Sequence, residues 1–139
     1  MTLVDAASRL GYSYVGGSEN NKKITIFNQE KEFQVLHSFE FNSDRKRMSV
    51  ILKDAQGQIK LYIKGADTII KARLKHSDQQ PYLKYIDQKL DVFARKGLRT
   101  LLIGMKVIDA AEYNAFYQKY MALADSDQKE KELGIKYFC

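Results

Sequence analysis

The sequence predicts an α+β domain with a mainly antiparallel, twisted sheet flanked by helices, and three observations support this prediction. Apolar residues alternate with polar ones over residues 33–41, 48–52 and 59–63, which is the period of a strand. A glycine-containing loop over residues 54–58 joins the last two segments, as in a hairpin. After Gly65 the apolar spacing becomes helical, so we expect helices that follow the strands and pack on the sheet.

The other elements follow from apolar spacing and from residues that start or stop regular structure. Gly11 and Gly97 each follow an apolar segment and are suited to end a helix, while Pro81 and Asp109 are suited to begin one. Helices are therefore expected over residues 3–10, 68–74 and 81–96, and after residue 109. Strands are expected over residues 12–15, 24–27, 33–41, 48–52, 59–63 and 98–107, with a loop at 18–23 and a turn at 28–31.

A chain of 139 residues with 45% hydrophobic residues has the size and composition of one domain with a packed core. We therefore expect a single domain over residues 1–139. Within it, residues 126–132 are a charged run, so residues 126–139 are expected to be a charged tail or the boundary to a following domain.

The net charge of +6, from 23 basic and 17 acidic residues, favours anionic partners such as nucleotides, nucleic acids or acidic lipid headgroups. Charge alone does not choose among them. The single cysteine is Cys139, so no intrachain disulfide can form and a reducing compartment is expected. No run of about 18 apolar residues occurs, so no membrane span is expected within these residues.

Several common nucleotide-binding and catalytic signatures are missing from the sequence. There is neither a P-loop nor a Gly-x-Gly-x-x-Gly motif. His37 and His76 lie far apart, without a nearby cysteine or histidine, so no metal site is expected. His37 interrupts an alternating apolar strand and is expected to be a buried or edge histidine. No Ser/His/Asp or Cys/His arrangement is present, so no catalytic residue is expected.

Residues 40–50, 62–67 and 97–101 each offer features that a nucleotide site needs: an aromatic face for a base, lysine or arginine for phosphates, or glycine for close backbone approach. Taken singly, these features have ordinary explanations. Phe41 continues an aromatic stripe and would be core, and residues 45–47 would be a solvated charge cluster or a weak nucleic-acid patch.

Arg99 is unusual because it lies in an otherwise apolar segment that predicts a strand. A charge at such a position must be exposed, paired or in contact with a ligand anion, since burying it without a partner costs too much free energy.

In this order, Glu-Phe-x-Ser-x-Arg-Lys-Arg-Met-Ser-Val, Tyr-x-Lys-Gly-Ala-Asp-Thr-Ile-Ile and Ala-x-Lys-Gly-Leu-Arg-Thr-Leu resemble the nucleotide-binding (N) domain of P-type ATPases. The resemblance is closest to the type IV branch, the phospholipid flippases, and it covers about residues 3–132. Residues 2–12 resemble the family's helix after its acidic motif, and Glu112-Tyr113 resembles its Glu-Tyr-x-x-Trp segment, with Phe116 in place of the tryptophan.

The resemblance implies roles for individual residues. Phe41 is expected to stack on adenine, Lys64 to line the nucleotide pocket and Arg99 to reach the phosphates. Gly65 is expected to let the backbone approach the base or ribose. The further pocket candidates are Lys46, Met48 and Ser49. Arg45 and Arg47 could equally be surface charges.

The resemblance also implies a cytosolic, ATP-binding domain of an integral membrane protein that translocates phospholipid. ATP would be the ligand, with Mg²⁺ accompanying it in the full-length parent, and the partners would be the parent's phosphorylation, actuator and transmembrane domains. The Asp-Lys-Thr-Gly-Thr phosphorylation motif is missing here, so the chain alone is expected to lack enzymatic activity. The isolated domain is also expected to be monomeric.

Two alternatives remain open at this point. A basic module could bind nucleic acid or an acidic protein surface through residues 45–47. Phosphate-backbone binding would then weaken steeply with salt, whereas stacking of adenine would depend on it less. The other alternative is an N domain from a cation-pump branch of the P-type ATPases, which the Lys-Gly-Ala-Asp and Arg-Lys-Arg-Met-Ser segments disfavour.

Overall fold

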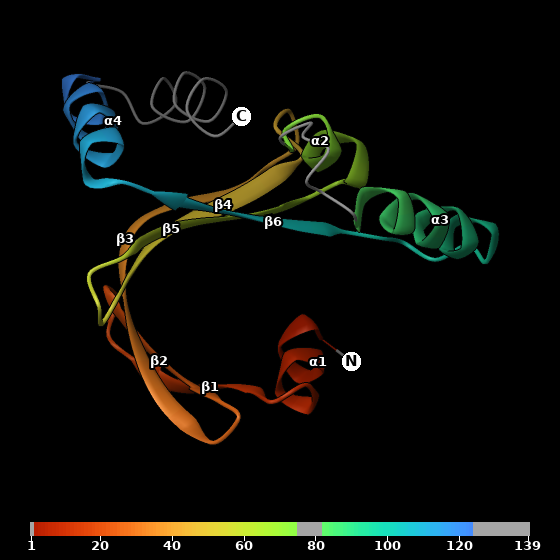
Figure 1. The fold of residues 1–139 in the computed structure, drawn as a ribbon, viewed down its shortest axis with the longest axis horizontal. Helices are drawn as coiled ribbons and strands as arrows, with labels where there is room; N and C mark the ends of the chain where they lie inside the picture. The colour runs from red at the N-terminus through yellow and green to blue at the C-terminus, as the bar shows by residue number, and fades with distance from the viewer. Residues whose placement is uncertain (1, 75–81, 124–139) are drawn as a thin grey trace.

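The computed structural model describes residues 2–74 and 82–123 and contains a six-stranded antiparallel sheet with four helices (Figure 1). Its strands are β1 (Tyr12–Gly17), β2 (Asn21–Ile26), β3 (Gln29–Asn42), β4 (Arg47–Asp54), β5 (Ile59–Gly65) and β6 (Leu102–Ile108). Its helices are α1 (Leu3–Arg9), α2 (Asp67–Lys71), α3 (Tyr82–Arg95) and α4 (Ala110–Ala122). Strand order in the sheet follows the sequence, β1 to β6, so the predicted α+β class is confirmed.

The long strand β3 connects the two parts of the sheet, β1–β2 on one side and β4–β6 on the other. It pairs with β2 through its first residues and with β4 through its later ones. The sheet bends along β3, so that β1 and β2 curl round toward α1 (Figure 1). The β3–β4 register shifts twice, between Val35 and His37 and between Phe39 and Asn42. Such shifts are β-bulges, which bend and twist the strand that carries the extra residue.

The hydrophobic core lies between α4 and one face of the sheet, which we call the helix-covered face. Its buried members come from β3, β4, β5, β6 and α4: Phe39, Ile51, Leu61, Ile108 and Phe116. Asp109 begins α4 as predicted, since its carboxylate accepts a hydrogen bond of 2.7 Å from the backbone N–H of Glu112. Helix α2 lies on the same side of the sheet as α4 (Figure 1).

The opposite face of β4, β5 and β6 is called the open face. Because side chains alternate along a strand, the register assigns nine residues to it: Met48, Val50, Leu52, Lys60, Tyr62, Lys64, Ile103, Met105 and Val107. The three β6 members are exposed, and Ile103 retains 70% of its accessible surface. The prediction that Lys60, Tyr62 and Lys64 share one face of their strand is confirmed by this register.

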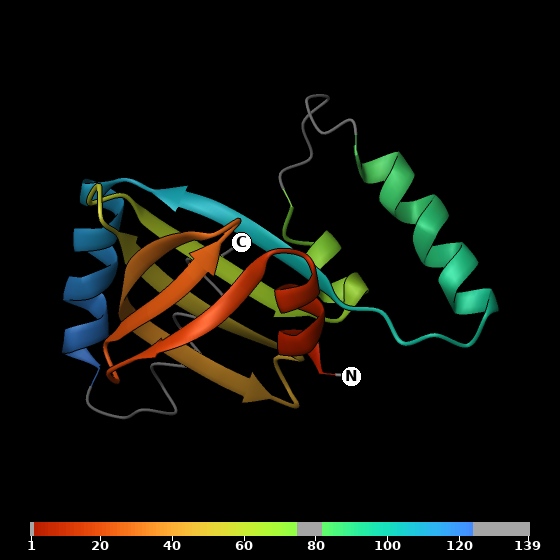
Figure 2. The same cartoon turned by 90° about the horizontal axis from the view of Figure 1, so that it is seen from below.

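Helix α3 stands clear of the sheet beyond the start of β6 (Figure 2). Lys71 of α2 forms an ion pair with Asp87 of α3. The predicted end of α3 is confirmed, because Gly97 has φ +68° and its N–H donates to the carbonyl of Ala94 at 2.9 Å. None of the described helices is both long and apolar enough to cross a membrane.

Several element boundaries differ from the sequence prediction. Strand β3 starts at Gln29, within the turn expected at 28–31. Strand β2 starts within the expected loop, because Lys22 and Lys23 extend the pairing with β3 and Lys23 lies 3.7 Å from Glu30. Helix α2 is shorter than residues 68–74. Strand β6 begins only at Leu102, since the chain must first return from the end of α3 before it can pair with Gly65. Pro81 and the predicted tail at 126–139 lie outside the described residues.

His37 lies on the helix-covered face within an aromatic cluster formed with α4. Its ring contacts Phe116 and Tyr120 with centroid distances of 5.3 and 4.6 Å, and its Nε2 lies 3.2 Å from the Tyr113 hydroxyl. Burial lowers the pKa of His37 below its usual value of 6.5. The fold therefore favours the neutral imidazole, as expected for a half-buried histidine.

We predict that acid weakens this fold through His37. Because the folded state prefers neutral His37, this residue contributes to the free energy of unfolding at pH values above its pKa in the unfolded chain, about 6.5. The contribution is lost as the pH falls through the lower pKa that His37 has in the folded state. Urea unfolding between pH 7.5 and 5 should show a decline that His37→Gln reduces. His76→Gln, which changes the other histidine, is the matched control. Equal declines in the His37→Gln variant and the wild type would contradict the prediction.

Candidate functional site

Phe41 reaches the open face because of the second bulge in β3. Phe39 pairs with Ser49 and Asn42 with Arg47, so Glu40 and Phe41 together oppose the single residue Met48. Asn42 thus falls on the side of buried Arg47, and Phe41 falls on the side of Met48. Phe41 is 60% exposed, whereas Phe39 is 3% exposed and belongs to the core.

Met48, Lys64 and Ile103 form a row across the open face beside Phe41. Met48 is opposite Lys64 in the β4–β5 register, and Lys64 is opposite Ile103 in the β5–β6 register. Directly opposed residues on one face have Cβ atoms about 4.5–5.5 Å apart. The predicted residues Phe41, Met48 and Lys64 are therefore neighbours. The sequence prediction missed Ile103 because it treated residues 98–107 as one apolar strand, without assigning its side chains to a face.

Lys64 is available to an anion, in contrast to Lys60 on the same strand. Lys60 lies 3.1 Å from the carboxylate of Asp54. Burial alone would raise the pKa of Asp54, but hydrogen bonds from Gln58, Lys60 and Gln56 hold it below its usual value. Among residues 2–74 and 82–123, no carboxylate lies within ion-pair distance of Lys64.

Lys46 ends the turn over residues 43–46, which joins β3 to β4. Its backbone has φ +52°, and its N–H donates to the carbonyl of Asn42 at 2.7 Å. Its own carbonyl accepts a hydrogen bond of 3.2 Å from Ala66. The side chain of Lys46 is exposed. The turn is thus attached to the end of β5.

Ser49 and Gly65 belong to the helix-covered side of the sheet. Ser49 is buried opposite Phe39 and Ile63, so it does not share the open face with Met48 and Lys64, and its place in the nucleotide pocket stays a prediction. Gly65 is buried opposite Arg47. A Cβ at this position would point toward the 43–46 turn rather than toward the open face.

The interpretation of residues 45–47 as a solvated charge cluster is wrong for two of the three residues. Arg45 and Arg47 are buried, at 6% and 3% exposure. Arg45 places its guanidinium 5.8 Å from the centre of the Phe39 ring, and Arg47 donates to the carbonyl of Arg45 at 3.0 Å. Their long side chains extend the core at the edge of the helix-covered face, which leaves Lys46 as the exposed member of the three.

Arg99 lies in the segment between α3 and β6, and its side chain is exposed. It precedes Leu102 by three residues, and Leu102 pairs with Gly65. Three residues span at most about 11 Å, so this segment enters the sheet at the Lys64 end of β5. Whether Arg99 converges with Phe41 and Lys64 on one ligand therefore stays a prediction.

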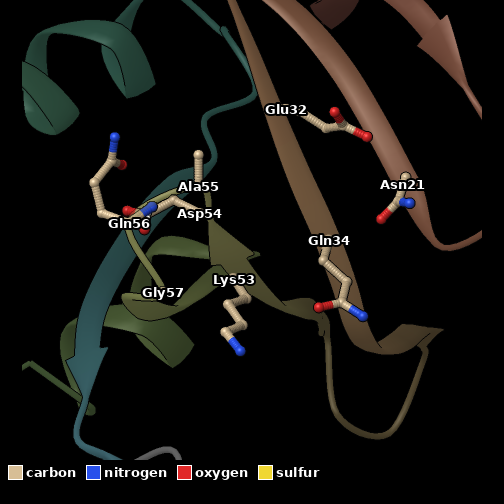
Figure 3. Close-up of a pocket in the computed structure, with 8 residues that line it drawn as sticks. All are labelled: Asn21, Glu32, Gln34, Lys53, Asp54, Ala55, Gln56 and Gly57. Atoms are coloured by element: carbon tan, nitrogen blue, oxygen red, sulfur yellow. Dashed lines mark hydrogen bonds between the residues drawn. The ribbon is translucent and has the colours of Figure 1, made fainter.

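Two hollows in the described structure lie away from these residues. An open, polar hollow of about 670 Å³ is bordered by β2, β3 and the turn after β4 (Figure 3). Its residues Gln34 and Lys53 are paired in register, and the alternation along β4 assigns them to the side opposite Leu52. A smaller apolar hollow of about 200 Å³ lies between α3 and residues 100–102. Neither includes any of the seven predicted site residues.

Comparison with known proteins identifies the class of domain. Residues 1–135 match the family described as P-type ATPase, cytoplasmic domain N, and the chain therefore belongs to this family. The match confirms the expected fold and the expected location of the domain on the cytosolic side.

The relatives of the chain are named as lipid transporters. It is 38% identical over 136 residues to a human protein named phospholipid-transporting ATPase IC, which covers 98% of this chain and 11% of the relative. It is 37% identical over 124 residues to phospholipid-transporting ATPase C887.12 of Schizosaccharomyces pombe, with 89% and 10% covered. It is 40% identical over 135 residues to phospholipid-transporting ATPase tat-1 of Caenorhabditis elegans, with 95% and 12% covered.

These matches confirm the resemblance to the phospholipid-transporting branch of the family. The chain spans about a tenth of the length of these relatives.

We predict that truncation of Phe39 lowers the stability of the domain far more than truncation of Phe41, although the two residues are only two positions apart. Phe39→Ala should lower the free energy of unfolding by about 3–5 kcal/mol, because it removes a buried ring from the core. Phe41→Ala should change it by about 0.5 kcal/mol or less, because that ring is exposed. Urea denaturation monitored by circular dichroism measures both. A loss from Phe41→Ala as large as that from Phe39→Ala would show that Phe41 is core.

Proposed function

We propose that this domain binds ATP on its open face, as the nucleotide-binding part of an ATP-driven P-type ATPase that translocates phospholipid. Membership of the cytoplasmic N-domain family and the names of the relatives support the parent's class. The observation that carries the ligand assignment is the gathering of Phe41, Met48 and Lys64 on one uncovered face of the sheet.

Each of these side chains has a chemical role in the proposal. The exposed ring of Phe41 offers a flat apolar surface for stacking of adenine. Met48 supplies a flexible, polarizable side chain beside it, and the ammonium group of Lys64 attracts the anionic part of the nucleotide. Arg99 contacts the phosphates from the segment that leads into β6, and Lys46 adds a second exposed cation near the base.

The domain's contribution to phosphoryl transfer is then the positioning of ATP. In the parent, the γ-phosphate passes to an aspartate in a neighbouring domain, and positioning together with charge stabilisation provides most of the catalysis. Mg²⁺ would arrive with the nucleotide and neutralise its phosphate charge. No cluster of three or more potential metal-ligating side chains occurs among the described residues.

The two alternative functions have less support. Binding of nucleic acid through residues 45–47 would need several exposed cations, but Arg45 and Arg47 are buried. A cation-pump parent is disfavoured because the relatives described above are named phospholipid transporters.

We predict that Phe41→Ala weakens ATP binding by about 1–3 kcal/mol, because it removes the stacking surface. Isothermal titration calorimetry and NMR titration of the domain with ATP measure the effect. Phe27→Ala is the matched control, since Phe27 is also an exposed phenylalanine but lies in the turn between β2 and β3. Equal affinity of the Phe41→Ala variant and the wild type would rule out the proposed base site.

We further predict that the chain hydrolyses no ATP above background but gains thermal stability from it, because a ligand that prefers the folded state raises the apparent Tm. Lys64→Ala should reduce this gain. Lys53→Ala, which removes a lysine from the opposite side of the sheet, should preserve it. Turnover that disappears with Lys64→Ala would contradict a purely positioning role for the domain.

A further inference from the structure

We propose that Gly65 is a positioning residue whose missing side chain lets the 43–46 turn sit against β5, and that this contact sets Phe41 relative to Lys64. The inference rests on the proposed nucleotide site and assigns Gly65 a role different from the one implied by the family resemblance. That resemblance suggests close approach of the backbone to the ligand. The structure instead gives Gly65 a role within the protein.

The space beside Gly65 is filled by the turn itself. A Cβ built on Gly65 would lie 2.6 Å from the carbonyl oxygen of Lys46 and 2.8 Å from the Cβ of Arg47. Both distances are shorter than non-bonded atoms tolerate, and the nearest atom belongs to backbone. Any larger residue at position 65 must therefore displace the turn. The same Lys46 carbonyl accepts the hydrogen bond from Ala66, so the displacement would also strain that bond.

A displaced turn would move Phe41 because the turn is tightly bonded to Asn42. The carbonyl of Asn42 accepts from the N–H of Lys46 at 2.7 Å, and its side-chain oxygen accepts from the N–H of Asp44 at 2.7 Å. Phe41 directly precedes Asn42 in the bulge. Lys64 directly precedes Gly65 in β5. The two proposed ligand-binding residues are thus each adjacent in sequence to a residue that holds this contact.

The direction in which a side chain at position 65 would point distinguishes a positioning role of Gly65 from direct contact with the ligand. Gly65 pairs with buried Arg47, so a side chain at position 65 would point to the helix-covered side, away from Phe41 and Lys64. Gly65→Ala would therefore leave the open face sterically free. A loss of nucleotide affinity in this variant would have to act through the turn.

The test compares Gly65→Ala with Gly104→Ala in the wild type and in Phe41→Ala. Gly104 is a buried glycine of the adjacent strand, and the atom nearest to a Cβ built there, at 3.2 Å, is the γ2-methyl carbon of Ile63 rather than a backbone atom. We expect Gly65→Ala to weaken ATP binding by about fivefold or more in the wild type, and by much less when Phe41 is already alanine. Gly104→Ala should weaken binding by less than about twofold in both backgrounds.

Non-additivity with Phe41→Ala is a result that a merely structural role would not produce. If Gly65→Ala does not fold, a second pair of variants decides. Asn42→Ala removes the side-chain oxygen that accepts from the N–H of Asp44, while the backbone hydrogen bond from Lys46 to Asn42 remains, and should weaken ATP binding. Asn42→Asp keeps a side-chain acceptor and should restore most of the affinity.

Two outcomes would overturn the inference, and they differ in meaning. If the wild-type chain binds no adenine nucleotide, both the proposed function and the proposed role of Gly65 are wrong. ATP binding by the wild type, with equal losses from Gly65→Ala and Gly104→Ala or with full additivity to Phe41→Ala, would remove only the role of Gly65.

Discussion

One extra residue in β3 determines which side of the sheet receives Phe41. Without the bulge opposite Met48, strict alternation would place Phe41 on the same face as Phe39, inside the core. With it, the aromatic ring joins Met48 and Lys64 on the open face. The proposed nucleotide site therefore depends on a local shift of register, which is held by the turn over residues 43–46 and its attachment to β5.

The helix-covered face of the sheet contributes the packed core, and the open face carries the proposed binding site. The helix-covered face packs Phe39, Ile51 and Phe116 into the core and also buries two arginines at its edge. This packing holds one side of β4 and β5, whose other side carries Met48 and Lys64. The open face retains exposed apolar residues such as Ile103 beside lysines, which is the mixture that an aromatic base linked to phosphates requires.

Much of the fold could be predicted from the sequence, because the spacing of apolar residues along a strand or helix indicates which side chains are buried. The hairpin of β4 and β5, the shared face of Lys60 and Lys64, and the cap of α4 at Asp109 follow from local patterns. The destination of Phe41 could not be predicted from its alternating stripe, because a bulge leaves no clear mark in residue spacing. The burial of Arg45 and Arg47 was also missed, because it depends on tertiary packing against Phe39.

The most direct test of the proposed open-face site is the measurement of intermolecular NOEs between ATP and the isotope-labelled domain. Adenine H2 and H8 should give NOEs to the ring of Phe41 and to the terminal methyl group of Met48, since both side chains lie on the open face beside Lys64. NOEs from adenine to residues bordering the polar hollow near Gln34, or to the aromatic cluster around His37, would contradict this site.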